Sequence, residues 1–177
     1  MKIWLSPHND DETLFGAYTL MREKPLVVIC TDGYIQGERG DNITAEQRRE
    51  ETRNAMKVLG CNVIFLGIKD TELTEENLEI SLSAFACDAI VYSPSIQVGN
   101  KQHDIVGKVA DKLFINSFHY TTYTPTELWT KGSTEIVPTE AEIDLKNKAL
   151  GCYTSQLNLP ATRPHFGAVI GKSEWYA

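Results

Sequence analysis

Short apolar runs rich in β-branched residues alternate with amphipathic stretches in the N-terminal half of the chain, and this alternation restricts the fold most. The runs cover residues 2–5, 26–31, 62–66 and 89–92. Apolar residues between and after them have helical spacing, as in Leu78, Leu82 and Phe85. Strands that alternate with helices indicate a parallel sheet covered on both faces. We therefore expect an α/β fold, a Rossmann-like three-layer sandwich with a mostly parallel sheet.

The stretches between the runs carry helix start and stop signals. Thr44 and Gln47 have the spacing of a capping box, and Gly60 is a typical residue just past a helix end. This pattern predicts a helix between the second and third runs. Thr74 is a candidate N-cap for the next helix, and another helix is expected over residues 12–22.

The C-terminal third has a different pattern. Residues 120–123 and 135–137 are short and alternating, which predicts an antiparallel flap or edge. A helix is expected from about Thr139 to Cys152. The apolar residues 166–170 predict a last strand.

Composition is that of a folded globular protein. The chain has 177 residues, of which 42% are hydrophobic and 23% are charged. No stretch rich in Pro, Gly or Ser divides it, so we expect a single domain over residues 1–177. The net charge of −7 and the pI near 5.1 disfavour nucleic acid or a membrane as partner. A small molecule is the expected partner, and a homo-oligomer stays open.

The N-terminus and the cysteines indicate the compartment. Pro7 and His8 come before any long apolar stretch develops, so neither a secretory signal nor a membrane span is expected. The 4 cysteines are scattered without a C-x-x-C pair, which is typical of reduced core residues. We therefore expect a cytoplasmic location.

An unusual polar group follows each apolar run. In chain order the groups are Pro7-His8-Asn9-Asp10-Asp11, Thr31-Asp32-Gly33, Lys69-Asp70, and Ser93-Pro94 leading to His103. The carboxyl ends of parallel strands meet at one edge of an open sheet, where ligands bind. The four groups are therefore expected to converge on one site.

Three of these residues have the chemistry of a catalytic zinc site. His8 and Asp11 offer a nitrogen and an oxygen ligand, and His103 is the natural third ligand from the loop after the fourth run. Two histidines and a carboxylate leave a coordination position open, as in hydrolytic zinc sites. Asp10, between the first two ligands, is free to act as a base toward water.

Other interpretations of the same residues stay open. Asp10 or Asp11 could only cap the following helix, and a histidine at a helix start, such as His103, is often a surface or capping residue. The ligand set also suits ferrous iron. The free acid beside a ligand favours hydrolysis over oxygen chemistry.

The ordered motifs resemble those of one family, the PIG-L/LmbE-like zinc deacetylases, which remove N-acetyl groups from glucosamine-containing substrates. Residues 7–12 resemble the family's H-P-D-D-E signature. The other matching elements, in chain order, are Thr31-Asp32-Gly33, Arg48-Arg49-Glu50-Glu51 with Ala55 and Leu59-Gly60, Phe65-Leu66-Gly67 with Asp70 and Leu73, Lys148 with Tyr153, Ser155 and Gln156, and Glu174-Trp175-Tyr176.

The resemblance implies roles for individual residues. It implies that His8, Asp11 and His103 bind zinc and that Asp10 is the general base, with a water activated by zinc as the nucleophile. It places Arg48 and Asp70 near the polar groups of the sugar. Arg48 could instead pair with acids on its own helix, and Asp70 could only shape a turn.

Two positions depart from the family pattern. Asn9 replaces a proline, and Asn100-Lys101-Gln102-His103 replaces H-x-D-H, keeping only the last ligand. Asn100 is then a candidate donor to the developing oxyanion.

The resemblance implies a zinc-dependent N-deacetylase acting on a small N-acetylated sugar conjugate. The rival functions are a metal-binding pseudoenzyme and a sugar-binding module of the same fold. A phosphoacceptor receiver domain is disfavoured, because the third run continues through Ile68 before Asp70 and because it leaves His8 and His103 unexplained.

Overall fold

The computed structural model describes residues 1–35, 42–96, 100–122 and 134–177. These residues form one sheet of seven strands in the order β3-β2-β1-β4-β5-β7-β6. The strands are β1 Lys2–Ser6, β2 Leu26–Thr31, β3 Val63–Ile68, β4 Ile90–Pro94, β5 Asn116–Tyr120, β6 Thr134–Ile136 and β7 Glu174–Tyr176. The helices are α1 Asp11–Glu23, α2 Ala45–Leu59, the 3₁₀ helix η1 Asp70–Glu72, α3 Glu75–Leu82, α4 Lys101–Leu113, α5 Glu140–Leu150, α6 Thr154–Leu157 and α7 Arg163–Ala168.

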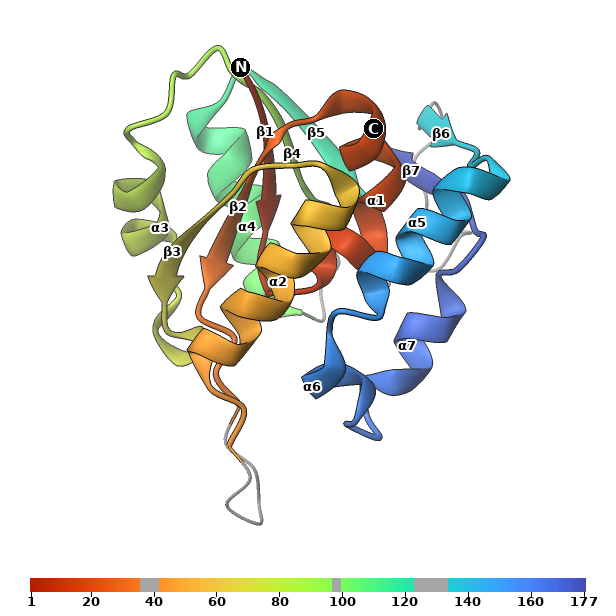
Figure 1. The fold of residues 1–177 in the computed structure, drawn as a ribbon. Coiled ribbons are helices and arrows are strands. Elements are labelled where there is room, and N and C mark those ends of the chain that lie inside the picture. The colour runs from red at the N-terminus through yellow and green to blue at the C-terminus, as the bar shows by residue number, and fades with distance from the viewer. Residues whose placement is uncertain (36–41, 97–99, 123–133) are drawn as a thin grey trace.

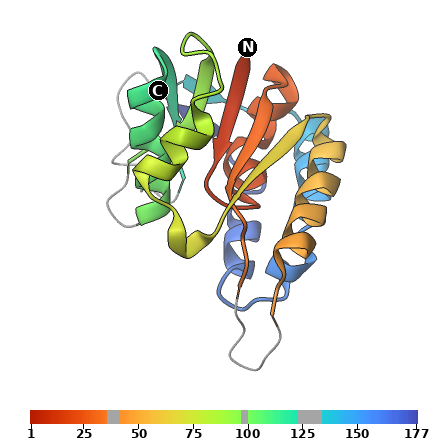
Figure 2. The same cartoon turned by 90° about the vertical axis from the view of Figure 1, so that its left-hand side faces the viewer.

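Helices cover both faces of the sheet, so the predicted three-layer α/β fold is confirmed. Helices α3 and α4 lie on one face, and α1, α2 and α5 lie on the other (Figures 1 and 2). Strands β1 to β5 pair in parallel, while β7 runs antiparallel to both β5 and β6. The sheet is therefore mostly parallel, as its apolar runs predict.

Side chains of β1 alternate between two hydrophobic cores. Trp4 packs in the core beneath α1, α2 and α5, whereas Ile3 and Leu5 pack in the core beneath α3 and α4. All three are fully buried. A strand that is buried on both faces has apolar residues at consecutive positions, which explains the apolar run in residues 2–5.

The predicted helix starts are present. Thr44 Oγ1 accepts a hydrogen bond from the Gln47 amide at 3.1 Å, and Gly60 follows α2 in the left-handed conformation. Thr74 forms a full capping box with Asn77 at the start of α3. Among the described residues no helix is both long enough and apolar enough to cross a membrane.

In the C-terminal third, the predicted strand over residues 166–170 is wrong, and only part of the predicted antiparallel edge is present among the described residues. Residues 166–170 are not a strand, because α7 occupies most of them, and Pro164 lies in its first turn where a missing N–H costs no hydrogen bond. The last strand is β7, which pairs with the predicted edge strand β6. In the segment 120–123, Tyr120 ends β5, which is parallel rather than antiparallel to β4, and Tyr123 lies outside the described residues.

A buried ion pair holds β7 against α1. Lys146 Nζ donates to Glu174 Oε1 at 2.9 Å and to the Leu14 carbonyl at 2.8 Å. Glu174 accepts from the backbone amides of Tyr18 and Thr19 at 3.0 Å. In a regular helix the Leu14 carbonyl accepts a hydrogen bond from the Tyr18 amide. Lys146 and Glu174 therefore bind the two backbone groups of one helical hydrogen bond of α1.

The lysine that pairs with Glu174 is Lys146, whereas the family resemblance includes Lys148. Lys148, assigned to the family's lysine position, is exposed on α5, whereas Lys146 is 1% exposed. Lys146 also lies 4.6 Å from the centroid of the Tyr18 ring. Lys146 is therefore the lysine of α5 that forms the buried ion pair, and Lys148 remains only a residue of the motif resemblance.

Candidate active site

The candidate site lies at the point where the strand order of the sheet reverses. From β1 the chain continues through α1 to β2 on one side, and from β4 it continues through α4 to β5 on the other. In parallel sheets, ligands generally bind at such a point, outside the carboxyl ends of the two strands. His8 and Asp11 follow β1, and His103 follows β4 in the first turn of α4.

His8, Asp11 and His103 come together as the sequence predicts. One ligand atom from each residue lies within 4.8 Å of the others. Asp11 Oδ2 is 2.9 Å from His8 Nδ1 and 3.2 Å from His103 Nε2. Two imidazole nitrogens and a carboxylate oxygen thus converge on a small volume, and this donor set fits a zinc ion.

Electrostatics separates the two neighbouring aspartates. Burial alone would raise the pKa of Asp11, but the imidazoles of His103 and His8 hold it well below its usual range. Burial would lower the pKa of His8, and the Asp11 carboxylate instead raises it to about 9. Burial raises the pKa of Asp10, although Arg48 opposes this. Asp11 therefore stays ionised as a ligand does, while Asp10 is the better proton acceptor.

Asp10 does not cap α1 with its side chain. It occupies the N-cap position, but its carboxylate makes no capping hydrogen bond within the described part of α1. Its Oδ2 instead lies 3.2 Å from Arg48 Nη2. The capping interpretation of Asp10 is therefore wrong, and its carboxylate is available beside the ligand cluster.

Arg48 is buried, and its guanidinium lies between the carboxylates of Asp10, after β1, and Glu51, on α2. Besides its bond to Asp10, its Nη1 lies 3.9 Å from Glu51 Oε2, so the expected pairing within α2 is present but long. Arg48 Nε and Nη1 have no hydrogen-bond acceptor among the described residues. Buried donors without an acceptor are rare, so these two groups are suited to a substrate oxygen.

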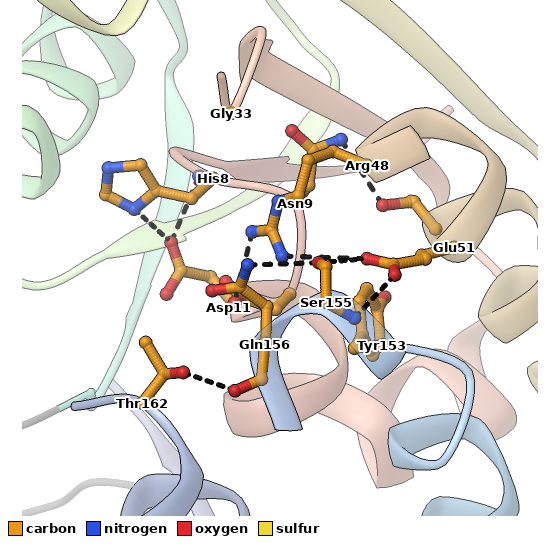
Figure 3. A network of polar contacts seen from close by, with 12 residues as sticks. His8, Asn9, Asp11, Gly33, Arg48, Glu51, Tyr153, Ser155, Gln156 and Thr162 are labelled. Atoms are coloured by element: carbon orange, nitrogen blue, oxygen red, sulfur yellow. Dashed lines mark hydrogen bonds and ion pairs between the residues drawn. The ribbon is translucent and has the colours of Figure 1, made fainter. Parts of the chain in front are cut away.

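Glu51 and Tyr153 tie the C-terminal segment to the site. Glu51 accepts from the Ser155 amide at 2.7 Å and from the Ser155 hydroxyl at 2.6 Å (Figure 3). The Tyr153 hydroxyl donates to Glu12, whose other oxygen accepts from Ser6 at 3.0 Å. Burial raises the pKa of Glu12 to about 7. Tyr153 and Ser155 are therefore hydrogen-bonded to α1, which follows Asp10, and to α2, which carries Arg48.

Asp70 shapes the turn after β2. Its Oδ1 accepts from the Gly33 amide at 3.2 Å, and its own amide donates to Asp32 at 3.4 Å. Gly33 has φ +66°, and an added Cβ would lie 2.4 Å from Asn9 Oδ1, so only glycine fits. The turn-shaping interpretation of Asp70 is therefore confirmed, and its contact with substrate stays a prediction.

Asn100 and Gln102 have definite partners in place of the family's histidine and aspartate. Asn100 caps α4, since its Oδ1 accepts from the Gln102 and His103 amides at 3.2 and 3.3 Å. Gln102 Oε1 lies 2.8 Å from His8 Nε2. The oxygen of Asn100 is thus committed to the helix that carries His103, and its amide nitrogen is the part that could face a substrate.

Comparison with known protein families identifies the chain. The model of the family PIG-L, described as GlcNAc-PI de-N-acetylase, matches residues 3–114, which is more than half of the sequence. The chain belongs to the PIG-L family. No curated protein matches it significantly in sequence.

Solved structures agree with the PIG-L fold. A 4-carboxy-2-hydroxymuconate hydratase, GalB, from Pseudomonas putida KT2440 has a TM-score of 0.77 at 17% identity, with 99% of this chain and 95% of that chain covered. N,N'-diacetylchitobiose deacetylase from Pyrococcus horikoshii has a TM-score of 0.71 at 18% identity, with 99% and 82% covered. The zinc-inhibited form of teicoplanin deacetylase Orf2 has a TM-score of 0.71 at 14% identity, with 98% and 96% covered.

The sequence of this PIG-L chain does not predict the contacts of Glu12, Glu51 and Gln102. Glu12 and Glu51 were available as motif residues, but their partners Tyr153 and Ser155 are about a hundred or more positions away, and no local pattern pairs them. In the sequence, Gln102 stands out only as a departure from the family pattern. Its spacing one residue before His103, on the first turn of a helix, is the signal that places it beside the ligands.

The cap at Asn100 leads to a stability prediction. Asn100→Ala should lower the free energy of unfolding by about 1 kcal/mol, because the first amides of α4 lose their acceptor. Asn100→Asp should keep most of the stability, since a carboxylate also caps. Urea unfolding followed by circular dichroism measures both. Equal losses in the two variants would show that capping is not what Asn100 contributes.

Proposed function

We propose that the chain is a zinc-dependent hydrolase that removes an N-acyl group, with acetyl expected, from a small glucosamine-containing or sugar-like molecule. The observation that carries this proposal is the His8, Asp11 and His103 cluster with Asp10 beside it. Membership of the PIG-L family and the likeness to deacetylase structures support it. A cytoplasmic location and a small N-acetylated sugar conjugate as partner are parts of the same proposal.

The three candidate ligands differ in exposure, and together they would leave one coordination position of the metal open. His8 Nδ1, Asp11 Oδ2 and His103 Nε2 would hold the zinc ion, and three protein ligands leave a coordination position open. When bound, zinc in such a site polarises an acyl carbonyl and lowers the pKa of water to about 7. The His103 side chain is 0% exposed and that of Asp11 is 2% exposed, whereas that of His8 is 20% exposed. The site therefore opens on the side of His8.

Asp10 would act as the general base and then as the acid. Its side chain is 11% exposed, and Arg48 Nη2 lies 3.2 Å from one of its two oxygens. The other oxygen is left to accept the proton of the attacking water. The raised pKa of Asp10 makes the carboxyl a better proton acceptor, and the same proton can pass to the leaving amine.

Substrate contacts are assigned to Arg48, Asp70 and Asn100. Arg48 offers its two N–H groups that lack an acceptor in the described structure, and these suit a sugar hydroxyl or carbonyl oxygen. Asn100 would donate from its amide nitrogen to the oxygen that becomes negative. Asp70 would contact the sugar with the oxygen that does not accept from Gly33.

A second candidate is a metal-binding protein or sugar-binding module without turnover. It is favoured by the capping of α4 by Asn100 and by the neutral amide of Gln102, which stand where the family has an ionisable pair. The likeness to a hydratase means that the fold by itself does not single out deacetylation.

A substrate panel decides between the candidates. Zinc-loaded protein is incubated with N-acetylglucosaminyl conjugates that differ in aglycone, and released acetate is measured. The deacetylase proposal predicts release from at least one conjugate, and none after removal of the metal by a chelator. Saturable binding of the conjugates without any acetate release would instead support the sugar-binding module.

A further inference from the structure

Gln102 connects the candidate ligand His8 to η1. Its Oε1 lies 2.8 Å from His8 Nε2, and its Nε2 donates to the backbone oxygen of Asp70 at 2.9 Å. Its backbone amide donates to Asn100 Oδ1, so the base of the side chain is also held. Hydrogen bonds therefore hold Gln102 both at its backbone and at its side-chain amide. The side chain links the segment after β1 and the start of η1 to α4.

The Asp70 contact determines which way the Gln102 amide points. A backbone carbonyl oxygen can only accept a hydrogen bond, so the NH₂ group of Gln102 must face Asp70. The flipped amide would set two acceptors against each other. The oxygen of Gln102 therefore faces His8, and because this oxygen can only accept, His8 must donate from Nε2.

A donor at Nε2 decides which nitrogen of His8 is left for a metal. A neutral imidazole carries its proton on one nitrogen and its lone pair on the other. With a proton held at Nε2, Nδ1 is the nitrogen left to give its lone pair to a metal ion; without a metal, Nδ1 carries a proton and donates to Asp11 Oδ2. Nδ1 is the nitrogen 2.9 Å from Asp11 Oδ2, on the side where the ligand atoms of Asp11 and His103 lie.

We propose that Gln102 is a positioning residue that keeps the proton of His8 on Nε2 and thereby presents Nδ1 to the metal. The proposal rests on the metal site of the proposed function. Hydrogen-bond partners of metal-bound histidines commonly fix the tautomer and ring orientation in this way. Gln102 does so with a neutral group, so it orients the ring without adding negative charge to the site.

The first test reads the bonded nitrogen of His8 directly. The unmodified protein, labelled with ¹⁵N and loaded with ¹¹³Cd in place of zinc, is studied by NMR, with the histidine signals assigned through the backbone. We expect a ¹¹³Cd coupling to Nδ1 of His8 and a bonded proton at its Nε2. A coupling to Nε2 of His8 would overturn the proposal while leaving the metal site in place. Absence of any metal binding would overturn the proposed function as well.

The second test measures the metal affinity of matched variants by competition with a chromophoric chelator. Gln102→Met keeps the length of the side chain but removes the acceptor, so its Kd for zinc should rise about 10–100-fold. Gln102→Glu keeps an acceptor at the same reach and should bind zinc at least as tightly as the parent. Lys101→Met, an exposed neighbour on α4, is the control and should leave the Kd unchanged.

The pattern across these variants separates positioning from simple structural support. Equal weakening in Gln102→Met and Gln102→Glu would mean that the bond to the Asp70 carbonyl matters and not the acceptor for His8, which overturns the proposal. An unchanged Kd in Gln102→Met also overturns it. Thermal unfolding of the metal-free variants shows whether they fold, and the NMR result on the unmodified protein decides the matter if Gln102→Met does not.

Discussion

Asp10→Asn should lower kcat for the proposed N-deacetylation by about 10²–10⁴-fold, while the variant should still bind its metal. The asparagine amide matches the carboxylate in shape, but it cannot take a proton from water near neutral pH. Arg48 loses its bond to the Asp10 carboxylate, yet Glu51 remains 3.9 Å from its guanidinium, so its charge is not left isolated. The expected loss therefore reports proton transfer and not unfolding.

Asp11→Asn is the matched control, since it makes the same chemical change one residue later. Asp11 Oδ2 lies between His8 and His103, so this variant should lose metal affinity together with activity. Metal content by mass spectrometry and acetate release are measured on both variants. If both lose metal to the same extent, the assignment of base and ligand is wrong. If Asp10→Asn keeps full turnover, Asp10 is not the base.

Lys146→Met should lower the free energy of unfolding by about 3–5 kcal/mol, because Glu174 would be left buried without its charged partner. Glu174 is 5% exposed and accepts from amides inside α1, so it cannot turn toward water without breaking these bonds. The Leu14 carbonyl also loses its donor. Methionine has a similar length to lysine, so lost packing contributes little.

Lys148→Met provides the control on the same helix. Lys148 is exposed, and its replacement should change the free energy of unfolding by less than about 0.5 kcal/mol. Urea unfolding curves of the two variants give the comparison. In a double variant, Lys146→Met with Glu174→Leu, part of the loss should return because no buried charge remains. Similar small changes for Lys146→Met and Lys148→Met would show that the ion pair does not hold β7 on α1.

The parallel half of the fold could be predicted because its signals are local. Runs such as residues 26–31 are buried on both faces, and caps such as Thr44 and Thr74 lie a few residues from the amides they accept from. The ligand cluster could be predicted because a general rule of parallel sheets brings strand ends together. His8 and His103 needed only a strand order in which β1 and β4 are neighbours.

The C-terminal third was less predictable because its signals conflict or act over long distances. Phe166, Val169 and Ile170 are apolar enough for a strand, but the first two pack against the core from a helical turn and its end. To predict that Lys146 and not Lys148 is buried, one must know which residues of α5 face the core. Lys146 falls on the stripe of the buried Leu150, and Lys148 does not.

The most direct test of the account is a titration of zinc into metal-free protein, with bound zinc and acetate release measured on the same samples. The account predicts that acetate release rises in proportion to bound zinc and reaches its maximum at about one zinc per chain. It also predicts that the double variant His8→Ala with His103→Ala binds no zinc at this site and releases no acetate. Zinc binding or acetate release that survives in the double variant would contradict the assignment of the metal centre to these residues.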